Sequence, residues 1–406
     1  MKRIVILCDG TWNEPHSRHP TNVVRLAQML APEDPKGVTQ IPIYLEGVGT
    51  GKGATAPSRF FDKYLGGMFG WGLYDNIIEA YRHLVFLYEP GDQVFIFGFS
   101  RGAFTARSLT GFIRSSGIIE RDSLFHLPEA VARYQLKNMQ DRPWENPEDT
   151  HPSSDESHAF RLKISPRMAT SPKEITWRKK NGHPSPDLFK VDYLGVLDSV
   201  GALGVPAHLS FARLLNRRKY EFHDADLSSM VKSARHAVAL DEKRRTFEPT
   251  LWSNVSELNA ESDLPGTPYL EQYFLGDHGS VGGGGDLTHL SSIALSWMIE
   301  GATDAGLAFD PDAVTALSRE HDPSGPLRNT TKPPKGPVNL ITRLISKDRV
   351  GPANTDGLHH SVLTRWALTG QTTDFAPYRP GSLNQLETQI AALLDKNRNG
   401  TGTRIA

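Results

Sequence analysis

Three polar residues could together carry out nucleophilic chemistry, because each one comes after a segment that is typical of a buried strand. Ser100 follows residues 93–99, Asp198 follows 190–197, and His278 comes shortly after 269–275. A histidine can take the proton of a serine hydroxyl, while a carboxylate holds the imidazole in the correct tautomer and stabilises its charged form. The three residue types therefore indicate acyl transfer, with Ser100 as the nucleophile, His278 as the general base and Asp198 as the residue that orients it.

The segment around Ser100 has the pattern Gly98-Phe99-Ser100-Arg101-Gly102. A serine at a tight turn from a strand to a helix has a strained backbone, and side chains at the flanking positions would collide with the neighbouring strand and helix. The two glycines remove those side chains. Residues 101–115 continue with helical spacing, so the pattern has the strand before it and the helix after it that this motif requires.

The chain order nucleophile, acid, histidine is that of α/β-hydrolases. Alone, Asp198 could be a turn cap at the end of a strand, and His278 could be a loop histidine beside glycines. Their order and placement together favour a triad. The predicted function is hydrolysis of carboxylic esters through an acyl-enzyme on Ser100, as in esterases and lipases. The alternative is a non-catalytic binding or interaction protein on the same scaffold, for which a broken triad would be the signature.

An acyl-transfer site also needs two N–H donors that stabilise the oxyanion. The amide of Arg101, at the start of the predicted helix, is one candidate, and the amide of Thr11 or Gly10 in the loop 9–13 is the other. Asp9 and Asn13 could also simply brace this loop. Four aromatic residues are candidates for the wall of an apolar substrate pocket, with core packing as the alternative. They are Trp12, Phe99, Phe69 and Trp71.

Strand-like and helix-like segments alternate along the chain, which predicts an α/β fold with a central, mainly parallel sheet flanked by helices. The predicted strands are 4–8, 41–45, 93–99, 190–197 and 269–275, and the predicted helices are 21–30, 76–88, 101–115, 233–240, 290–301 and 383–394. We expect residues 1–300 to form the catalytic domain and residues 301–406 to form a helical and loop extension packed on it. Residues 120–186 are rich in proline and charge, which predicts a lid or irregular insertion.

Composition excludes several classes of protein. The 45 basic residues nearly balance the 46 acidic ones, which argues against nucleic acid as a partner. The single cysteine, Cys8, excludes an internal disulfide and a cysteine-based zinc site, and no cofactor or metal site is expected. The sequence has no signal peptide and no transmembrane segment, so we expect a cytoplasmic protein as synthesised. Export by a signal-independent system and peripheral membrane contact stay open, and the sequence does not indicate an oligomeric state.

Two motifs of phosphate chemistry are partly matched, and each one lacks a residue that it requires. Asp9-Gly10-Thr11 after a strand is similar to the haloacid dehalogenase motif, which needs an aspartate where this sequence has Leu7. The glycine-rich segment 47–53 would need Ser or Thr after its lysine to form a Walker loop, and Gly53 stands there. Arg107, on the predicted helix after the nucleophile, is interpreted as a structural ion-pair residue, with a phosphate-binding role as the alternative.

Five segments together resemble an uncharacterised α/β-hydrolase family that includes the bacterial type VI secretion phospholipase effectors of the first class. They are CDGTWN, GFSRGAFTAR, LDSVGALG, HAVALDEKRRTFEPTLW, and GDHGSVGGGGD with LSSIALSWM, and they span roughly residues 4 to 300. The resemblance implies a Ser-Asp-His triad at Ser100, Asp198 and His278, and an ester or lipid as the substrate. Two positions depart from the family pattern: Ser280 replaces the usual aspartate, and Gly285-Asp286 replaces an aromatic residue.

Overall fold

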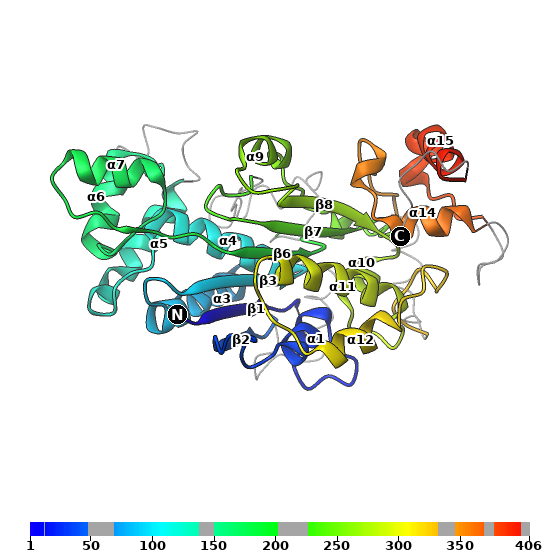
Figure 1. The fold of residues 1–406 in the computed structure, drawn as a ribbon, viewed down its shortest axis with the longest axis horizontal. Helices are drawn as coiled ribbons and strands as arrows, with labels where there is room; N and C mark the ends of the chain where they lie inside the picture. The colour runs from blue at the N-terminus through cyan, green and yellow to red at the C-terminus, as the bar shows by residue number, and fades with distance from the viewer. Residues whose placement is uncertain are drawn as a thin grey trace.

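The computed structural model describes residues 1–11, 13–47, 69–137, 150–201, 226–331, 346–368 and 377–398. Its centre is a six-stranded sheet in the order β2-β1-β3-β6-β7-β8, in which every neighbouring pair is parallel. The strands are β1 (Arg3–Cys8), β2 (Gln40–Leu45), β3 (Gln93–Phe99), β6 (Tyr193–Leu197), β7 (Ala234–Ala239) and β8 (Tyr269–Phe274). Helices cover both faces of the sheet (Figure 1), so the predicted α/β-hydrolase-like fold is confirmed.

Alternate residues of β1 enter two separate cores. Ile4 and Ile6 pack with the helices of one face, and Val5 and Leu7 pack with those of the other. Because successive side chains of a strand point to opposite faces, a strand covered on both sides needs an uninterrupted apolar run, and β1 has one. The first face carries α3 (Phe69–Leu87) and α4 (Arg101–Ser116), and the second carries α1 (Asn22–Met29), α11 (His289–Asp304) and α12 (Pro311–Ser318).

The strand register brings the predicted site residues to one edge of the sheet. Cys8 pairs with Gly98, and Phe99 pairs with Leu197, so β1, β3 and β6 end side by side. β7 and β8 run in the same direction and end at the same edge. Residues that directly follow these strands therefore converge at the carboxyl edge, where sites form in parallel sheets.

One predicted helix is a strand in the structure. The segment 233–240 forms β7, which is paired on both sides with β6 and β8. Its alanines favour a helix, but the segment is short and sits where both neighbouring strands offer hydrogen-bond partners, so tertiary pairing overrides local propensity. Ala237, Val238 and Ala239 are fully buried there.

The described part of the predicted insertion 120–186 is folded and compact. It contains η1 (Arg121–His126), α5 (Leu127–Lys137), α6 (Asp155–Ile164), α7 (Pro172–Lys180), and a small sheet of β4 (Met168–Ala169) with β5 (Asp187–Leu188). In Figure 1, α5, α6 and α7 lie at the end of the sheet where β1 begins, opposite α10 (His278–Gly282). This position does not suit a lid over the carboxyl edge. Residues 138–149 of the insertion lie outside the described residues.

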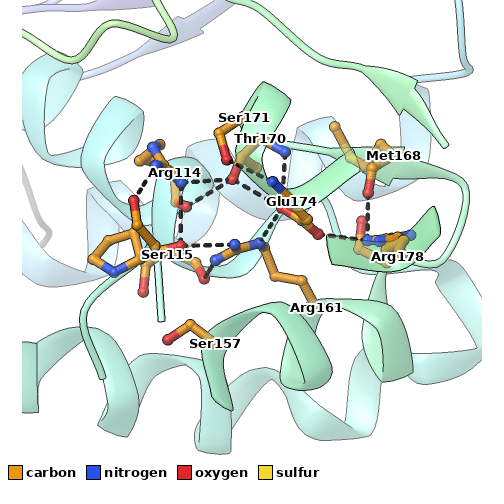
Figure 2. Close-up of polar contacts among 12 residues, drawn as sticks. Arg114, Ser115, Ser157, Arg161, Met168, Thr170, Ser171, Glu174 and Arg178 are labelled. Carbon is orange, nitrogen blue, oxygen red and sulfur yellow. Dashed lines mark hydrogen bonds and ion pairs between the residues drawn. The ribbon is translucent and has the colours of Figure 1, made fainter. Parts of the chain in front are cut away.

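A buried cluster of charges holds this insertion together (Figure 2). Glu174 of α7 pairs with Arg161 of α6 at 2.7 Å and with Arg178 at 2.6 Å, and all three side chains are fully buried. Arg161 also donates to the carbonyl of Ser115 at 3.0 Å, near the end of α4. We call Arg161, Glu174 and Arg178 the Arg–Glu–Arg cluster, and it ties the insertion to α4.

The chain after α12 returns to the core in two described stretches. They contain η3 (Thr355–Gly357), α14 (His360–Ala367), η4 (Gly381–Leu386) and α15 (Glu387–Arg398). His359 N–H donates to the carbonyl of Tyr273 on β8 at 3.0 Å, and Trp366 and Leu383 join the core that contains α11. Two short elements, η2 (Arg245–Phe247) and α9 (Val255–Glu261), connect β7 and β8.

Candidate active site

Ser100 stands at the turn between β3 and α4 with a strained backbone. Its φ is 58° and its ψ is -121°, which is uncommon for a residue with a side chain. A Cβ on Gly98 would lie 2.4 Å from the carbonyl oxygen of Gly102, and one on Gly102 would lie 2.1 Å from that of Cys8. The two glycines are therefore required for β3, the turn and α4 to pack this closely.

His278 and Asp198 form a buried hydrogen-bonded pair. Nδ1 of His278 lies 2.5 Å from Oδ2 of Asp198. The His278 ring sits between two aromatic rings, with centroids 4.7 Å from Phe99 and 4.7 Å from Phe247. These contacts fix the plane of the imidazole beside the residue that precedes Ser100. In the described part of the chain, no hydrogen bond joins Ser100 Oγ to His278, so the structure links two of the three predicted catalytic residues directly.

Arg349 completes the surroundings of Asp198, and no pattern in the sequence marks it as a site residue. Its guanidinium forms a two-pronged ion pair with the Asp198 carboxylate, at 2.6 Å and 3.0 Å. Burial acts to raise the pKa of Asp198, but the charge of Arg349 and the hydrogen bond with His278 outweigh burial and hold that pKa below its ordinary value. Asp198 is therefore a carboxylate although its side chain is fully buried.

The loop after β1 lies directly against the nucleophile turn. A Cβ on Gly10 would lie 3.2 Å from the Cβ of Ser100. The Gly10 amide, however, donates to Oδ1 of Asp9 at 2.6 Å and is engaged in this structure, so its role as an oxyanion donor stays a prediction. Asp9 also accepts hydrogen bonds from Thr21 and Tyr44, both at 2.7 Å, and so braces the loop. The sequence could not show that a neighbouring carboxylate takes up this amide.

Arg101 and Thr11 carry the two other predicted oxyanion donors. Arg101 is the first residue of α4, where the helix dipole favours negative charge. Thr11 follows Gly10, and its hydroxyl oxygen is buried without a hydrogen-bond partner among the described residues. Such an unpaired buried hydroxyl calls for a partner, which a ligand could supply.

Of the four predicted pocket residues, the structure describes the side chain of Phe99 alone. Phe99 is 5% exposed and packs on His278, while a Cβ on Gly282 would overlap its ring. Its role is to pack the site, with no open pocket wall formed by its ring. Trp12 and the side chains of Phe69 and Trp71 lie outside the described residues.

The loop that carries His278 is capped by its own residues. Asp277 accepts from both the amide and the hydroxyl of Ser280, at 2.9 Å and 2.8 Å. The amide of His278 donates to Glu242 at 3.2 Å, and Glu242 is paired with Arg244. Ser280, which departs from the family pattern, thus takes part in the N-terminal cap of α10.

Arg107 has a structural environment. It donates to the carbonyl of Thr250, and its guanidinium carbon lies 5.7 Å from the centroid of the Trp252 ring.

No helix within the described ranges is long and apolar enough to cross a membrane. Over the same residues, no group of three or more His, Cys, Asp or Glu side chains is arranged to hold a metal ion.

A family model described as the T6SS phospholipase effector Tle1-like catalytic domain matches residues 2–301. The chain belongs to this family. Membership supports hydrolase activity, and it confirms the resemblance that the sequence motifs indicated. The match includes Ser100, Asp198 and His278 and ends before Arg349.

Relatives of this Tle1-like chain are longer than the part it matches. It is 29% identical over 255 residues to the uncharacterized protein YEL023C of Saccharomyces cerevisiae, covering 61% of this chain and 32% of the yeast protein. The predicted bacterial character is therefore too narrow for this group of proteins.

Two solved structures are also similar. An uncharacterized protein from Pseudomonas aeruginosa has a TM-score of 0.36 and 16% identity, with 98% of this chain and 58% of that chain covered. The Tle1 effector bound to the VgrG spike from the type 6 secretion system has a TM-score of 0.32 and 18% identity, with 71% and 52% covered. The chain thus spans little more than half the length of these two proteins.

Proposed function

We propose that this protein is a serine hydrolase that cleaves carboxylic esters through an acyl-enzyme on Ser100. The observation that carries the proposal is the arrangement at the carboxyl edge of the sheet. A strained serine stands at the turn from β3 to α4, and a hydrogen-bonded His278–Asp198 pair packs against Phe99 beside it. This is the composition and chain order of a catalytic triad.

The hydrogen bond between His278 and Asp198 sets the direction of proton transfer. Because Asp198 is a carboxylate, it accepts, and the proton of the pair resides on Nδ1 of His278. A neutral imidazole carries one N–H, so Nε2 keeps its lone pair and can take the proton of the Ser100 hydroxyl. Catalytic hydrogen bonds often tighten only when substrate is bound, so we expect the hydrogen bond from Ser100 Oγ to Nε2 to form in the complex with substrate.

In the reaction, Ser100 Oγ attacks the ester carbonyl while its proton moves to His278. The backbone amide of Arg101, with the backbone amide of Thr11 as the second donor, stabilises the oxyanion. The imidazolium then protonates the leaving alkoxide, and the alcohol departs. Water, deprotonated by His278, then attacks the acyl-enzyme; the bond to Ser100 Oγ breaks, the imidazolium returns its proton to that oxygen, and the carboxylic acid is released.

Phospholipids are the proposed substrate class, because the family is described by its phospholipase effectors. A lipid substrate would require contact with a membrane surface. This proposal depends on ester hydrolysis at Ser100.

The test is turnover of p-nitrophenyl esters of increasing chain length and release of fatty acid from phospholipid vesicles. Ser100→Ala should abolish both activities in a folded protein. Ser296→Ala, which removes a hydroxyl that contacts His321 far from the site, is the matched control and should keep them. Equal activity of wild type and Ser100→Ala would overturn the proposal. Vesicle binding without turnover by the wild type would favour the non-catalytic alternative.

A further inference from the structure

Arg349 is held by four hydrogen bonds that leave its guanidinium little freedom. One terminal nitrogen donates to Oδ1 of Asp198 at 2.6 Å and to the carbonyl of Ala239 at 2.7 Å. The other donates to Oδ2 of Asp198 at 3.0 Å and to the carbonyl of Phe247. This two-pronged geometry is specific to arginine, since the ammonium group of lysine cannot match both carboxylate oxygens.

Each oxygen of the Asp198 carboxylate accepts two hydrogen bonds. Oδ1 accepts from the amide of Ala239 at 2.9 Å and from Arg349, and Oδ2 accepts from His278 and from Arg349. The carboxylate therefore cannot rotate without losing an ion pair. Its orientation decides where the His278 ring lies, so Arg349 acts on the imidazole through Asp198.

Charge balance gives Arg349 a second effect. A fully buried carboxylate is strongly disfavoured unless a positive charge pairs with it. A general base must be neutral before it takes a proton, and a neutral imidazole supplies a hydrogen bond but no charge, so Arg349 is the cation that keeps Asp198 ionised when His278 acts as the base. A protonated Asp198 could not stabilise the imidazolium that forms during acyl transfer.

Arg349 comes from a part of the chain beyond the family match, which ends at residue 301. The short stretch around it is attached to the core next to the site. Lys347 N–H donates to the carbonyl of Lys243 at 3.0 Å, and Asp348 pairs with the side chain of Lys243 at 3.1 Å. These contacts hold the stretch in place, so that the guanidinium of Arg349 lies at the carboxyl edge.

We propose that Arg349 is a positioning residue of the active site, which orients Asp198 and keeps it ionised, so that the C-terminal extension is part of the catalytic apparatus. The proposal rests on the proposed hydrolysis at Ser100. It predicts that a chain limited to the family-matched region lacks an element that catalysis requires.

The pH dependence of activity separates this role from simple anchoring of the extension. The titratable and charged groups around His278 and Asp198 are Glu242, Arg244, Tyr273, Asp277 and Arg349. Of these, Arg349 is the cation that contacts Asp198 directly. Without it, either Asp198 stays ionised and favours the imidazolium, or Asp198 becomes protonated. In both cases the active form is populated at higher pH, so the acidic limb of the kcat/KM profile moves upward.

The experiment compares full-length wild type with Arg349→Met and Arg349→Lys on a soluble p-nitrophenyl ester. For Arg349→Met we expect kcat to fall about 100-fold, less than the ~10,000-fold that follows loss of a working triad carboxylate. KM should stay near its wild-type value, and the acidic limb should move to higher pH. Arg349→Lys keeps the positive charge but loses the two-pronged contact with the carboxylate, so kcat should fall with a smaller shift of the acidic limb. Lys347→Met removes an exposed cation from the same stretch and should change neither kcat nor the pH profile.

Chemical rescue gives an independent readout. A cavity of ≈ 380 Å³ is lined by Arg349, Arg244, Tyr273 and Val350, so truncation of the Arg349 side chain would open the space of its guanidinium to small solutes. In Arg349→Ala, millimolar guanidinium should restore kcat in a saturable way, and sodium at equal ionic strength should not. Should Arg349→Ala not fold, the pH profile of Arg349→Lys decides. Wild-type kcat and pH profile in both Arg349→Met and Arg349→Lys would overturn the proposal, as would a loss of kcat without any pH shift or rescue.

This outcome differs from failure of the proposed function. If Ser100→Ala retains activity, the proposed function is wrong and the role of Arg349 falls with it. If Ser100→Ala is inactive and Arg349→Met matches Lys347→Met, hydrolysis at Ser100 stands and the role of Arg349 alone is refuted.

Discussion

The Arg–Glu–Arg cluster in the insertion (Figure 2) and the Asp198–Arg349 pair at the carboxyl edge both bury a carboxylate against guanidinium groups. The helices of the cluster, α6 and α7, lie at the end of the sheet opposite α10 (Figure 1). In the cluster, both oxygens of Glu174 are used by arginines and by the amide of Thr170 at 3.1 Å. At Asp198, one oxygen also contacts His278. The two carboxylates therefore differ in that Asp198 has a hydrogen-bond partner, His278, that can gain and lose a proton during the reaction.

That difference shows how similar chemistry can serve stability in one place and reactivity in another. Burial acts to raise the pKa of Glu174, but its two arginines outweigh burial and lower it, as Arg349 does for Asp198. Both carboxylates are thus kept ionised. Among the described residues, the hydrogen bonds of the Glu174 carboxylate go to Arg161, Thr170 and Arg178, so they hold α6 to α7. Asp198, in contrast, is hydrogen-bonded to an imidazole and can pass the effect of its charge to it.

The largest effect is expected from Asp198→Asn, which removes the acid and keeps the shape. Asparagine can hold the wrong imidazole tautomer, and such a change lowers kcat about 10,000-fold in a serine triad. The measurement is kcat on a soluble ester, normalised to folded protein by circular dichroism. Glu174→Gln is the matched control, because it changes a buried carboxylate in the same way away from the site. Comparable loss of kcat in both variants would erase the distinction between the two clusters.

Glu174→Gln should instead lower the free energy of unfolding. It leaves Arg161 and Arg178 buried without their anion, and breaking a buried ion pair costs about 3–5 kcal/mol. Urea unfolding measures the loss, and kcat per folded molecule should stay unchanged. Glu89→Gln is the control, because Glu89 pairs with Arg121 and Arg167 at an exposed site, so a far smaller change is expected. Equal losses in the two variants would contradict the structural role of the cluster.

The sequence predicted the reacting residues because their positions follow from local patterns. Ser100, Asp198 and His278 each come after a strand, and parallel strands place their carboxyl ends at one edge. Gly98 and Gly102 were informative because close packing at the turn excludes side chains. The fold class follows from the same alternation of apolar strands and helices.

The residues that support the site could not be predicted in the same way. Arg349 meets Asp198 across 151 positions, and no periodic pattern or motif marks it. In the insertion, Glu174 and Arg178 are spaced as a surface helix pair would be, so their burial depends on Arg161 from another helix. Burial of charge is a property of the tertiary structure, which is why this region was interpreted as irregular.

A third buried carboxylate, Asp241, extends the comparison to a partner that carries no charge. It accepts from the amide of Gly276 at 2.7 Å and from the hydroxyl of Tyr378 at 2.9 Å. Burial is the dominant influence and raises its pKa to about 6, although both hydrogen bonds oppose the increase. Like Asp198, Asp241 meets the C-terminal extension, but a hydroxyl does not offset the cost of burying its charge as a guanidinium does.

The raised pKa of Asp241 predicts a pH-dependent stability of opposite sign to that of Asp198 and Glu174. Between about pH 4 and 6 the folded protein holds this proton more tightly than the unfolded chain, so the contribution of Asp241 is fully present below about pH 4 and is lost as pH rises through about 6. The loss is at most about 3 kcal/mol. Asp198 and Glu174 contribute stability above about pH 4 that is lost as pH falls.

Asp241→Asn isolates this contribution, because the wild-type curve sums all three carboxylates. Relative to the wild type, the variant should gain free energy of unfolding as pH rises from about 4 to 7, by up to about 3 kcal/mol. Urea unfolding at several pH values measures the difference. A difference that does not change with pH would mean that Asp241 titrates normally and that Tyr378 is an adequate partner.

The smallest effect is expected at Ser280, where the departure from the family pattern can be tested. Its hydroxyl donates to Asp277, but His278 is held mainly by Asp198 and the aromatic rings around it. Ser280→Ala should therefore cost about 1 kcal/mol of stability and change kcat less than about threefold. Ser324→Ala is a close control, because Ser324 donates its amide and hydroxyl to Asp322 in the same way. Similar stability losses with unchanged kcat in both would show that Ser280 caps a turn; a large loss of kcat in Ser280→Ala alone would make it part of what positions His278.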